Sequence, residues 1–170
     1  DLLLADTGAI LAQRAETIRE NDTAGTLSER LAELGAELLL ENLPGFLEGR
    51  LVPKAQDDAL ATYAPMLNKE DGLLDFSQPA ESLERRVRAM QPWPGAHFTW
   101  QGERLKVYRV SVAEVPAELA QSLPGQTLRW AGKPALRAAD GLLVLEEVQP
   151  AGKRRLTGKE FLPGAKNWGT

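Results

Sequence analysis

The sequence predicts an α+β protein with a helical first part and a small β-barrel in its second part. Leucines of the first part recur at the spacing of one face of an amphipathic helix: Leu27, Leu31, Leu34 and Leu38. Short apolar segments after residue 96 alternate with glycine-containing turns. That succession is typical of a small barrel of the oligonucleotide-binding kind.

The first part should begin with a strand or a loosely alternating extended segment at residues 9–18. Thr26, Leu27, Ser28 and Glu29 form a capping-box pattern, which predicts the start of the long helix. Pro44-Gly45 should interrupt or kink this helix before Arg50.

Residues 51–78 contain several prolines and no firm period, so we interpret them as a linker that packs along its neighbours. Ser77 is expected to cap a second helix, with Pro79 in its first turn. The helix should end at Pro92, within the rigid corner Pro-Trp-Pro-Gly. The predicted strands then follow at residues 97–100, 105–112, 127–130, 134–138 and 142–148, before a short closing helix capped by Thr157 and Glu160.

Charge is distributed unevenly along the 170 residues. Residues 1–80 hold 6 Lys and Arg against 15 Asp and Glu, whereas residues 81–170 hold 14 against 9. A basic second half indicates a polyanionic partner such as nucleic acid, although ordinary surface solvation would also account for a net charge of this size. With 43% hydrophobic residues, no cysteine and no apolar run of about 20 residues, we expect a folded cytoplasmic protein without disulfides or a membrane span.

No phosphate-binding loop, metal-ligand cluster or activated nucleophile is apparent in the sequence. The single histidine, His97, is expected to pack or to lie at the surface. Trp93, Trp100 and Trp130 could stack bases, but in so small a barrel their packing in the core or at the corner is favoured. Trp168 is expected to be mobile near the chain end.

Several segments resemble methionyl-tRNA formyltransferases, in the order in which that family carries them. ADTGAIL resembles the LDTG-type motif of folate-dependent formyltransferases, and residues 22–43 resemble the helix that follows it. Residues 61–98 combine a tyrosine, a Lys-Glu-Asp-Gly turn, an arginine-bearing helix and Pro-Trp-Pro-Gly, which is the most specific part. VQPAGK at 148–153 and residues 157–164 complete the likeness.

The resemblance implies three parts. Residues 1–50 would be the end of the catalytic domain, a remnant of a Rossmann-like α/β domain that keeps a strand and the long helix. Residues 51–77 would be the linker, and residues 78–170 an OB-like tRNA-binding barrel with flanking helices.

The resemblance also implies an activity, namely formylation of the amino group of methionyl initiator tRNA with 10-formyltetrahydrofolate as donor. Asp6 matches the catalytic aspartate of the family. The family's catalytic asparagine and histidine precede the matched region, so we expect this chain alone to be inactive. The full enzyme would be a monomer, whereas the exposed helix 26–49 would allow this chain to dimerise, and residues 1–50 would otherwise be loosely ordered.

The same resemblance points to a positive surface that holds the tRNA, because lysine and arginine supply phosphate contacts. At least one of the three helix arginines should pair with Glu81 or Glu84 instead. The candidates are Arg85, Arg86, Arg88, Arg104, Lys106, Arg109, Lys133, Lys153, Arg154, Arg155 and Lys159. The spacing of residues 105–112 leaves open whether Lys106 and Arg109 point outward.

Two alternative functions stay open at this point. Sugar-nucleotide formyltransferases and other folate-dependent formyltransferases share the same pair of domains. A nucleic-acid-binding module without catalytic activity is the alternative from a different class.

Overall fold

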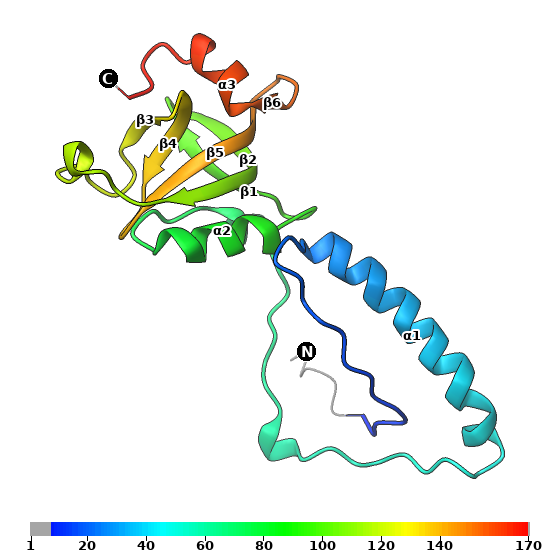
Figure 1. The fold of residues 1–170 in the computed structure, drawn as a ribbon. Helices are drawn as coiled ribbons and strands as arrows, with labels where there is room; N and C mark the ends of the chain where they lie inside the picture. The colour runs from blue at the N-terminus through cyan, green and yellow to red at the C-terminus, as the bar shows by residue number, and fades with distance from the viewer. Residues whose placement is uncertain (1–7, 170) are drawn as a thin grey trace. The chain divides into compact units, whose positions relative to one another are not determined.

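The computed structural model describes residues 8–169, which divide into a first unit ending at Leu67 and a second unit beginning at Asn68 (Figure 1). Asp6, the predicted catalytic aspartate, lies outside the described residues. The first unit contains α1 (Ala24–Leu47) and the 3₁₀ helix η1 (Asp58–Leu60). The second unit contains the remaining helices and the sheet.

The long helix α1 begins earlier than the sequence predicts. The Thr23 hydroxyl accepts a hydrogen bond from the Thr26 N–H, and the Thr26 hydroxyl accepts one from the Thr23 N–H. This reciprocal pair is the capping box, so the predicted box at residues 26–29 is wrong by one turn. Pro44 lies inside the helix, which continues to Leu47 and ends where Gly49 adopts φ +73°.

An arginine holds the segment before α1 against that helix. The Arg30 guanidinium donates to Glu16 at 2.9 Å and to both carboxylate oxygens of Asp22 at 2.6 and 2.7 Å. The hydrogen bond from Arg30, with a backbone N–H from Arg19, holds the pKa of Asp22 well below its usual range. These charge-assisted contacts fix the turn that leads into the helix.

Of the two alternatives predicted for residues 9–18, a strand or a loosely alternating extended segment, the strand is not formed. Among the described residues, its only ladder contact is an isolated antiparallel bridge between Ile10 and Lys54. A strand needs hydrogen-bonding partners along its length, and within the described part of the first unit only Ile10 of this segment has such a partner. The leucine face of α1 is only partly covered within the described residues: Leu31 is 46% exposed, whereas Leu27, Leu34 and Leu38 are half-buried, and α1 has no fully buried residue.

In the second unit, α2 (Ala80–Ala89) follows the 3₁₀ helix η2 (Lys69–Gly72). The predicted cap by Ser77 is wrong, because the Ser77 hydroxyl donates to Asp75 instead. The Ala80 N–H at the start of α2 donates to the carboxylate of Asp140 at 2.9 Å. A residue 60 positions away therefore caps the helix, and ties it to the turn before β5.

The sheet confirms the predicted strands to within two residues at each end and adds a short sixth. All its pairings are antiparallel, in the order β1-β2-β5-β4-β3, with β6 paired to β5. The strands are β1 (Ala96–Trp100), β2 (Glu103–Ala113), β3 (Thr127–Trp130), β4 (Lys133–Arg137), β5 (Leu142–Pro150) and β6 (Leu156–Thr157). The 3₁₀ helix η3 (Ala117–Leu119) lies between β2 and β3.

Two tight hairpin turns set the pairing register of β1 with β2 and of β3 with β4. The turn Gln101-Gly102 has φ of 51° and 80°, and the turn Ala131-Gly132 has φ of 48° and 72°. Positive φ at both central residues is typical of the type I′ turn, whose twist matches that of the paired strands. The mixed helix and antiparallel sheet is the predicted α+β class.

The core of the second unit lies between the sheet and its helices. Apolar residues of α2 reach it on one side, and α3 (Gly158–Phe161) with the 3₁₀ helix η4 (Leu162–Gly164) reaches it on the other (Figure 1). The predicted capping box of the closing helix is confirmed, since Thr157 and Glu160 exchange side-chain and backbone hydrogen bonds. Gly158 is required there, because a Cβ atom would lie 2.1 Å from the Leu145 carbonyl oxygen.

Trp168 is the anchor of the chain end, which corrects the prediction that it is mobile. Its side chain is fully buried, and the indole N–H donates to the Leu128 carbonyl at 2.7 Å. Its ring lies 5.4 Å from Trp100 and 5.3 Å from Phe161, centroid to centroid. Trp100 therefore packs on the core as predicted, whereas Trp93 at the proline corner is 53% exposed.

Candidate nucleic-acid interface

The arginines of α2 are all engaged inside the second unit. Arg88 pairs with Glu84 at 2.6 Å, and Arg85 lies 3.5 Å from Glu81. Arg86 donates to the Asp71 carbonyl at 2.6 Å. The expectation that at least one of them pairs with a neighbouring glutamate is confirmed for Arg85 and Arg88, whereas Arg86 keeps its charge because its partner is a backbone carbonyl.

Two members of the basic cluster at 153–155 are also held by partners. Arg154 lies 3.1 Å from Glu160, and Arg155 lies 3.6 Å from Glu147 while its guanidinium stacks 3.6 Å from the centre of the Tyr108 ring. The Thr157 backbone N–H and then the Arg154 side chain lower the pKa of Glu160 to about 2. The loop is therefore fixed by its arginines, and Lys153 is its member without an ion pair among the described residues.

Strand β2 presents both of its lysine and arginine candidates to solvent. Lys106 follows the inward-outward alternation, and a register shift between Val107 and Arg109 then turns Arg109 outward as well. Arg109 pairs with Glu147 at 3.0 Å. Neither Arg104 nor Lys106 makes an ion pair within the part of the chain that the structure describes.

Lys133 is neutralised by a partly buried carboxylate. Its ammonium lies 2.8 Å from Glu146, which also accepts from Ser111 at 2.8 Å. Burial raises the pKa of Glu146, but the hydrogen bonds from Lys133 and Ser111 outweigh it and leave that pKa below its ordinary value. Lys133 is thus bound within the sheet.

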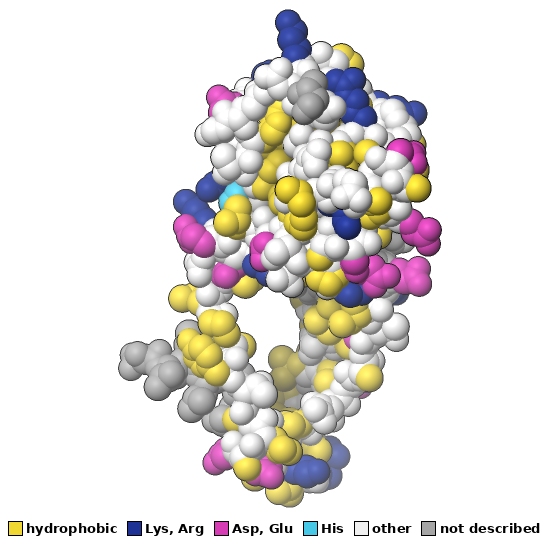
Figure 2. All heavy atoms as spheres, turned by 90° about the vertical axis from the view of Figure 1, so that its left-hand side faces the viewer, with side chains coloured by type: hydrophobic (Ala, Val, Ile, Leu, Met, Phe, Trp, Pro, Cys, Tyr) yellow, Lys and Arg dark blue, Asp and Glu magenta, His cyan; other side chains and the backbone are white. Residues whose placement is uncertain are grey.

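Five cations of the second unit without an ion pair among the described residues lie on β2, on α3 and on the loops after β5 and η4. Arg104 and Lys106 project from the same face of β2, Lys153 belongs to the loop after β5, Lys159 lies in α3, and Lys166 follows η4. Arg104, Lys153 and Lys166 line one shared pocket. We call these five residues the cationic edge; on the face drawn in Figure 2, Lys and Arg side chains gather at the upper end of the second unit.

Sequence reasoning missed Lys166. It stands alone between alanine and asparagine, so no local charge pattern marks it. Its place near Lys153 follows from the packing of the chain end through Trp168, which is a long-range contact. Lys69 is a further lysine without an ion pair among residues 68–169, but it belongs to η2 and not to the elements that carry the cationic edge.

The described residues do not assemble a catalytic site. His97 is 8% exposed, and its Nδ1 atom lies 3.2 Å from the Gly95 carbonyl oxygen, where a packing role explains it. Between residues 8 and 169, no three acidic or histidine side chains are placed to hold a metal ion. Nor does any helix in that range have the length and apolar character to cross a membrane.

The second unit is thus an α+β domain that carries the cationic edge. Residues 66–166, more than half of the chain, match the family model described as formyl transferase, C-terminal domain. The chain therefore belongs to the formyl transferase C-terminal domain family.

Individual relatives are more specific. The chain is 42% identical over 160 residues to the methionyl-tRNA formyltransferase of Pelobacter propionicus, covering 94% of this chain and 49% of that protein. It is 44% identical over 163 residues to the methionyl-tRNA formyltransferase of Desulfotalea psychrophila, covering 95% and 49%. The chain thus spans about half the length of the curated relatives it matches, and the resemblance inferred from its motifs is confirmed.

Solved structures share the fold at low sequence identity. HypX from Aquifex aeolicus in complex with tetrahydrofolic acid has a TM-score of 0.63 at 19% identity, covering 96% of this chain and 29% of HypX. The N-formyltransferase from Helicobacter canadensis has a TM-score of 0.59 at 16% identity, covering 85% and 51%. At these identities the likeness concerns the fold alone.

Proposed function

We propose that this chain is the tRNA-binding C-terminal part of a methionyl-tRNA formyltransferase. The complete enzyme would transfer a formyl group from 10-formyltetrahydrofolate to the amino group of methionyl initiator tRNA. The observation that carries the proposal is the cationic edge, where cations stay unpaired although most arginines of the unit have partners. Free cations at one place attract the phosphates of RNA.

The division of labour follows from the chemistry of formyl transfer. The reaction needs a neutral amine as nucleophile, a group that accepts its proton, and donors that stabilise the oxyanion on the formyl carbon. The single histidine of the described residues, His97, is buried beside the Gly95 carbonyl oxygen, where it does not face a substrate. We therefore assign these tasks to the rest of the enzyme, with Asp6 contributed by this chain.

The proposal includes the finer architecture that the resemblance implies. Residues 1–50 would complete a Rossmann-like catalytic domain, residues 51–77 would link it, and residues 78–170 would form the OB-like tRNA-binding domain. The exposed leucines of α1 support the first assignment, because another part of the catalytic domain would cover them. Without that cover, helix 26–49 would support dimerisation of this chain, which sedimentation at several concentrations would detect.

The relatives named for tRNA favour this function over a sugar-nucleotide substrate. The sugar formyltransferases resemble this chain in fold, at 16% sequence identity. No observation on the described residues favours a module that never takes part in catalysis.

Binding of initiator tRNA as a function of salt concentration tests the proposal. Lys106→Ala and Lys159→Ala each remove one free cation of the cationic edge, and each should lower the slope of log affinity against log salt by about 0.7–0.9. Lys69→Ala is the matched control, since Lys69 has no ion pair among residues 68–169 and does not belong to the edge. Equal slopes for all three variants and the original chain would contradict the proposal.

The isolated chain should show no formyl transfer. Incubation with 10-formyltetrahydrofolate and charged initiator tRNA should yield no formylmethionyl-tRNA above a protein-free blank. Turnover at the rate of a complete formyltransferase would refute the assignment of the oxyanion donors and the proton acceptor to another part of the enzyme.

A further inference from the structure

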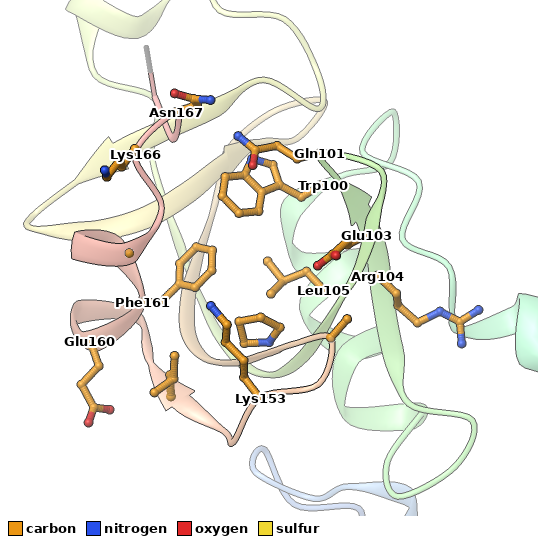
Figure 3. Close-up of a pocket in the computed structure, with 14 residues that line it drawn as sticks. Trp100, Gln101, Glu103, Arg104, Leu105, Lys153, Glu160, Phe161, Lys166 and Asn167 are labelled. Atoms are coloured by element: carbon orange, nitrogen blue, oxygen red, sulfur yellow. The ribbon is translucent and has the colours of Figure 1, made fainter.

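The cationic edge borders a pocket of about 440 Å³, within the range of roughly 300–1,000 Å³ usual for small-ligand sites. The β1–β2 turn, the loop after β5, α3 and the residues after η4 together form it (Figure 3). Trp100, Leu105 and Phe161 give it an apolar floor, and Glu103, Lys153 and Lys166 contribute charged groups.

The floor is a rigid aromatic surface. Trp100 lies 5.5 Å from Phe161 and 5.4 Å from Trp168, centroid to centroid, and Trp168 is fully buried. Trp100 itself is only partly buried and lines the pocket. A ring that is already fixed by its neighbours loses little conformational entropy when a planar ligand stacks on it.

Opposite charges face this pocket without neutralising each other. Figure 3 shows the Lys153 ammonium and the Glu103 carboxylate pointing toward the pocket from different elements, whereas the Arg104 guanidinium points away. Neither Lys153 nor Glu103 makes an ion pair among residues 8–169. A phosphate alone would suit Lys153 but would be repelled by Glu103, so the ligand must offer hydrogen-bond donors as well as negative charge.

A nucleotide meets both requirements, since it joins a planar base that carries N–H donors to a phosphate. We propose that the pocket holds one unstacked base of the bound RNA. The base stacks on the floor at Trp100, its exocyclic amino group donates to Glu103, and the adjoining phosphate contacts Lys153. The site therefore prefers bases with an exocyclic amino group, such as cytosine, over uracil, which has none. This inference rests on the proposed binding of tRNA.

The first test compares two short single-stranded RNAs, oligocytidylate and oligouridylate, for binding to the full chain. Oligocytidylate should bind about fivefold or more tightly. Glu103→Gln replaces an exposed carboxylate by an amide of the same shape, and should reduce this preference toward unity with an unchanged near-ultraviolet circular dichroism spectrum. Lys153→Ala should weaken binding to both RNAs, whereas Lys69→Ala, the matched lysine outside the pocket, should weaken neither.

The second test is direct ultraviolet cross-linking of initiator tRNA to the full chain, with the attached peptides identified by mass spectrometry. Cross-links should map to the peptides that contain Trp100 or Phe161. Cross-links confined to Trp93 or Trp130 would overturn the inference.

The outcomes separate this inference from the proposed function. Equal affinity of the two oligonucleotides, together with salt slopes that still respond to Lys106→Ala and Lys159→Ala, would overturn the base pocket and leave tRNA binding intact. Failure of the full chain to bind tRNA at low salt would overturn both.

Discussion

Replacing Trp168 by alanine should remove about 4 kcal/mol from the free energy of unfolding of the second unit. Its side chain is fully buried, and a tryptophan of this kind covers roughly 150–250 Å². At about 25 cal/mol per Å² this area corresponds to about 4–6 kcal/mol, near the 3–5 kcal/mol typical of such truncations. Trp168→Phe should cost about 2 kcal/mol, because it also leaves the buried Leu128 carbonyl without its donor.

Urea unfolding followed by far-ultraviolet circular dichroism measures both effects without relying on tryptophan fluorescence. With a slope near 2 kcal/mol per M, the alanine variant should unfold at about 2 M lower urea. Trp93→Phe is the control, since Trp93 is 53% exposed and should change stability by less than about 0.5 kcal/mol. A shift for Trp168→Ala no larger than the control would refute the argument that Trp168 anchors the chain end.

Three further substitutions or titrations test particular contacts. Gly158→Ala should destabilise the second unit by about 1–3 kcal/mol, because the added Cβ would lie 2.1 Å from a carbonyl oxygen of β5; Gly164→Ala, whose Cβ meets nothing within 4 Å, should be near neutral in the same urea assay. Asp140→Ala should cost about 1 kcal/mol, because it removes the acceptor at the start of α2. Ser77→Ala should cost less. Thermal unfolding measures both variants, and a larger loss for Ser77→Ala would show that Ser77 is the cap. The pKa of Glu160 is about 2 against an ordinary 4.5, so its contribution to stability is complete above pH 4.5 and is lost as the pH falls toward 2. Carboxyl ¹³C NMR should show that carboxylate titrating near pH 2, and a midpoint near 4.5 would contradict the capping geometry.

The local parts of the fold were predictable from sequence. Strand periodicity and two-residue glycine turns are contained in neighbouring residues, so the five main strands and the closing capping box were found. The start of α1 is a local error, because Thr23 and Thr26 form its capping box one turn before the predicted one. Two other failed predictions depend on distant residues. Asp140 caps α2 across 60 positions, and Trp168 is buried by strands that lie far from it in sequence.

The sequence identifies the basic residues of the candidate site, but it does not reveal which of them form ion pairs. Sequence reasoning named Lys106, Lys153 and Lys159 among the basic residues, and all three are exposed without ion pairs in the described part of the chain. It could not foresee that Glu160 and Glu147 engage Arg154 and Arg155, because those pairs depend on how β5 and α3 pack. The assignment of individual residues to tRNA stays a prediction.

The position of β5 in the sheet has a consequence for the order in which the protein forms during synthesis. Strand β5 lies between β2 and β4 in the sheet, and β6 pairs with β5 as well. Strand β5 therefore joins the β1–β2 and β3–β4 hairpins, both of which precede it in the chain. While the ribosome has released only the β1–β2 hairpin, that hairpin lacks the partner that covers its open side. The second unit therefore completes its sheet only after residue 157 has emerged, and locks its chain end only when Trp168 follows. Until then, the growing chain exposes the unpaired backbone edge of β2.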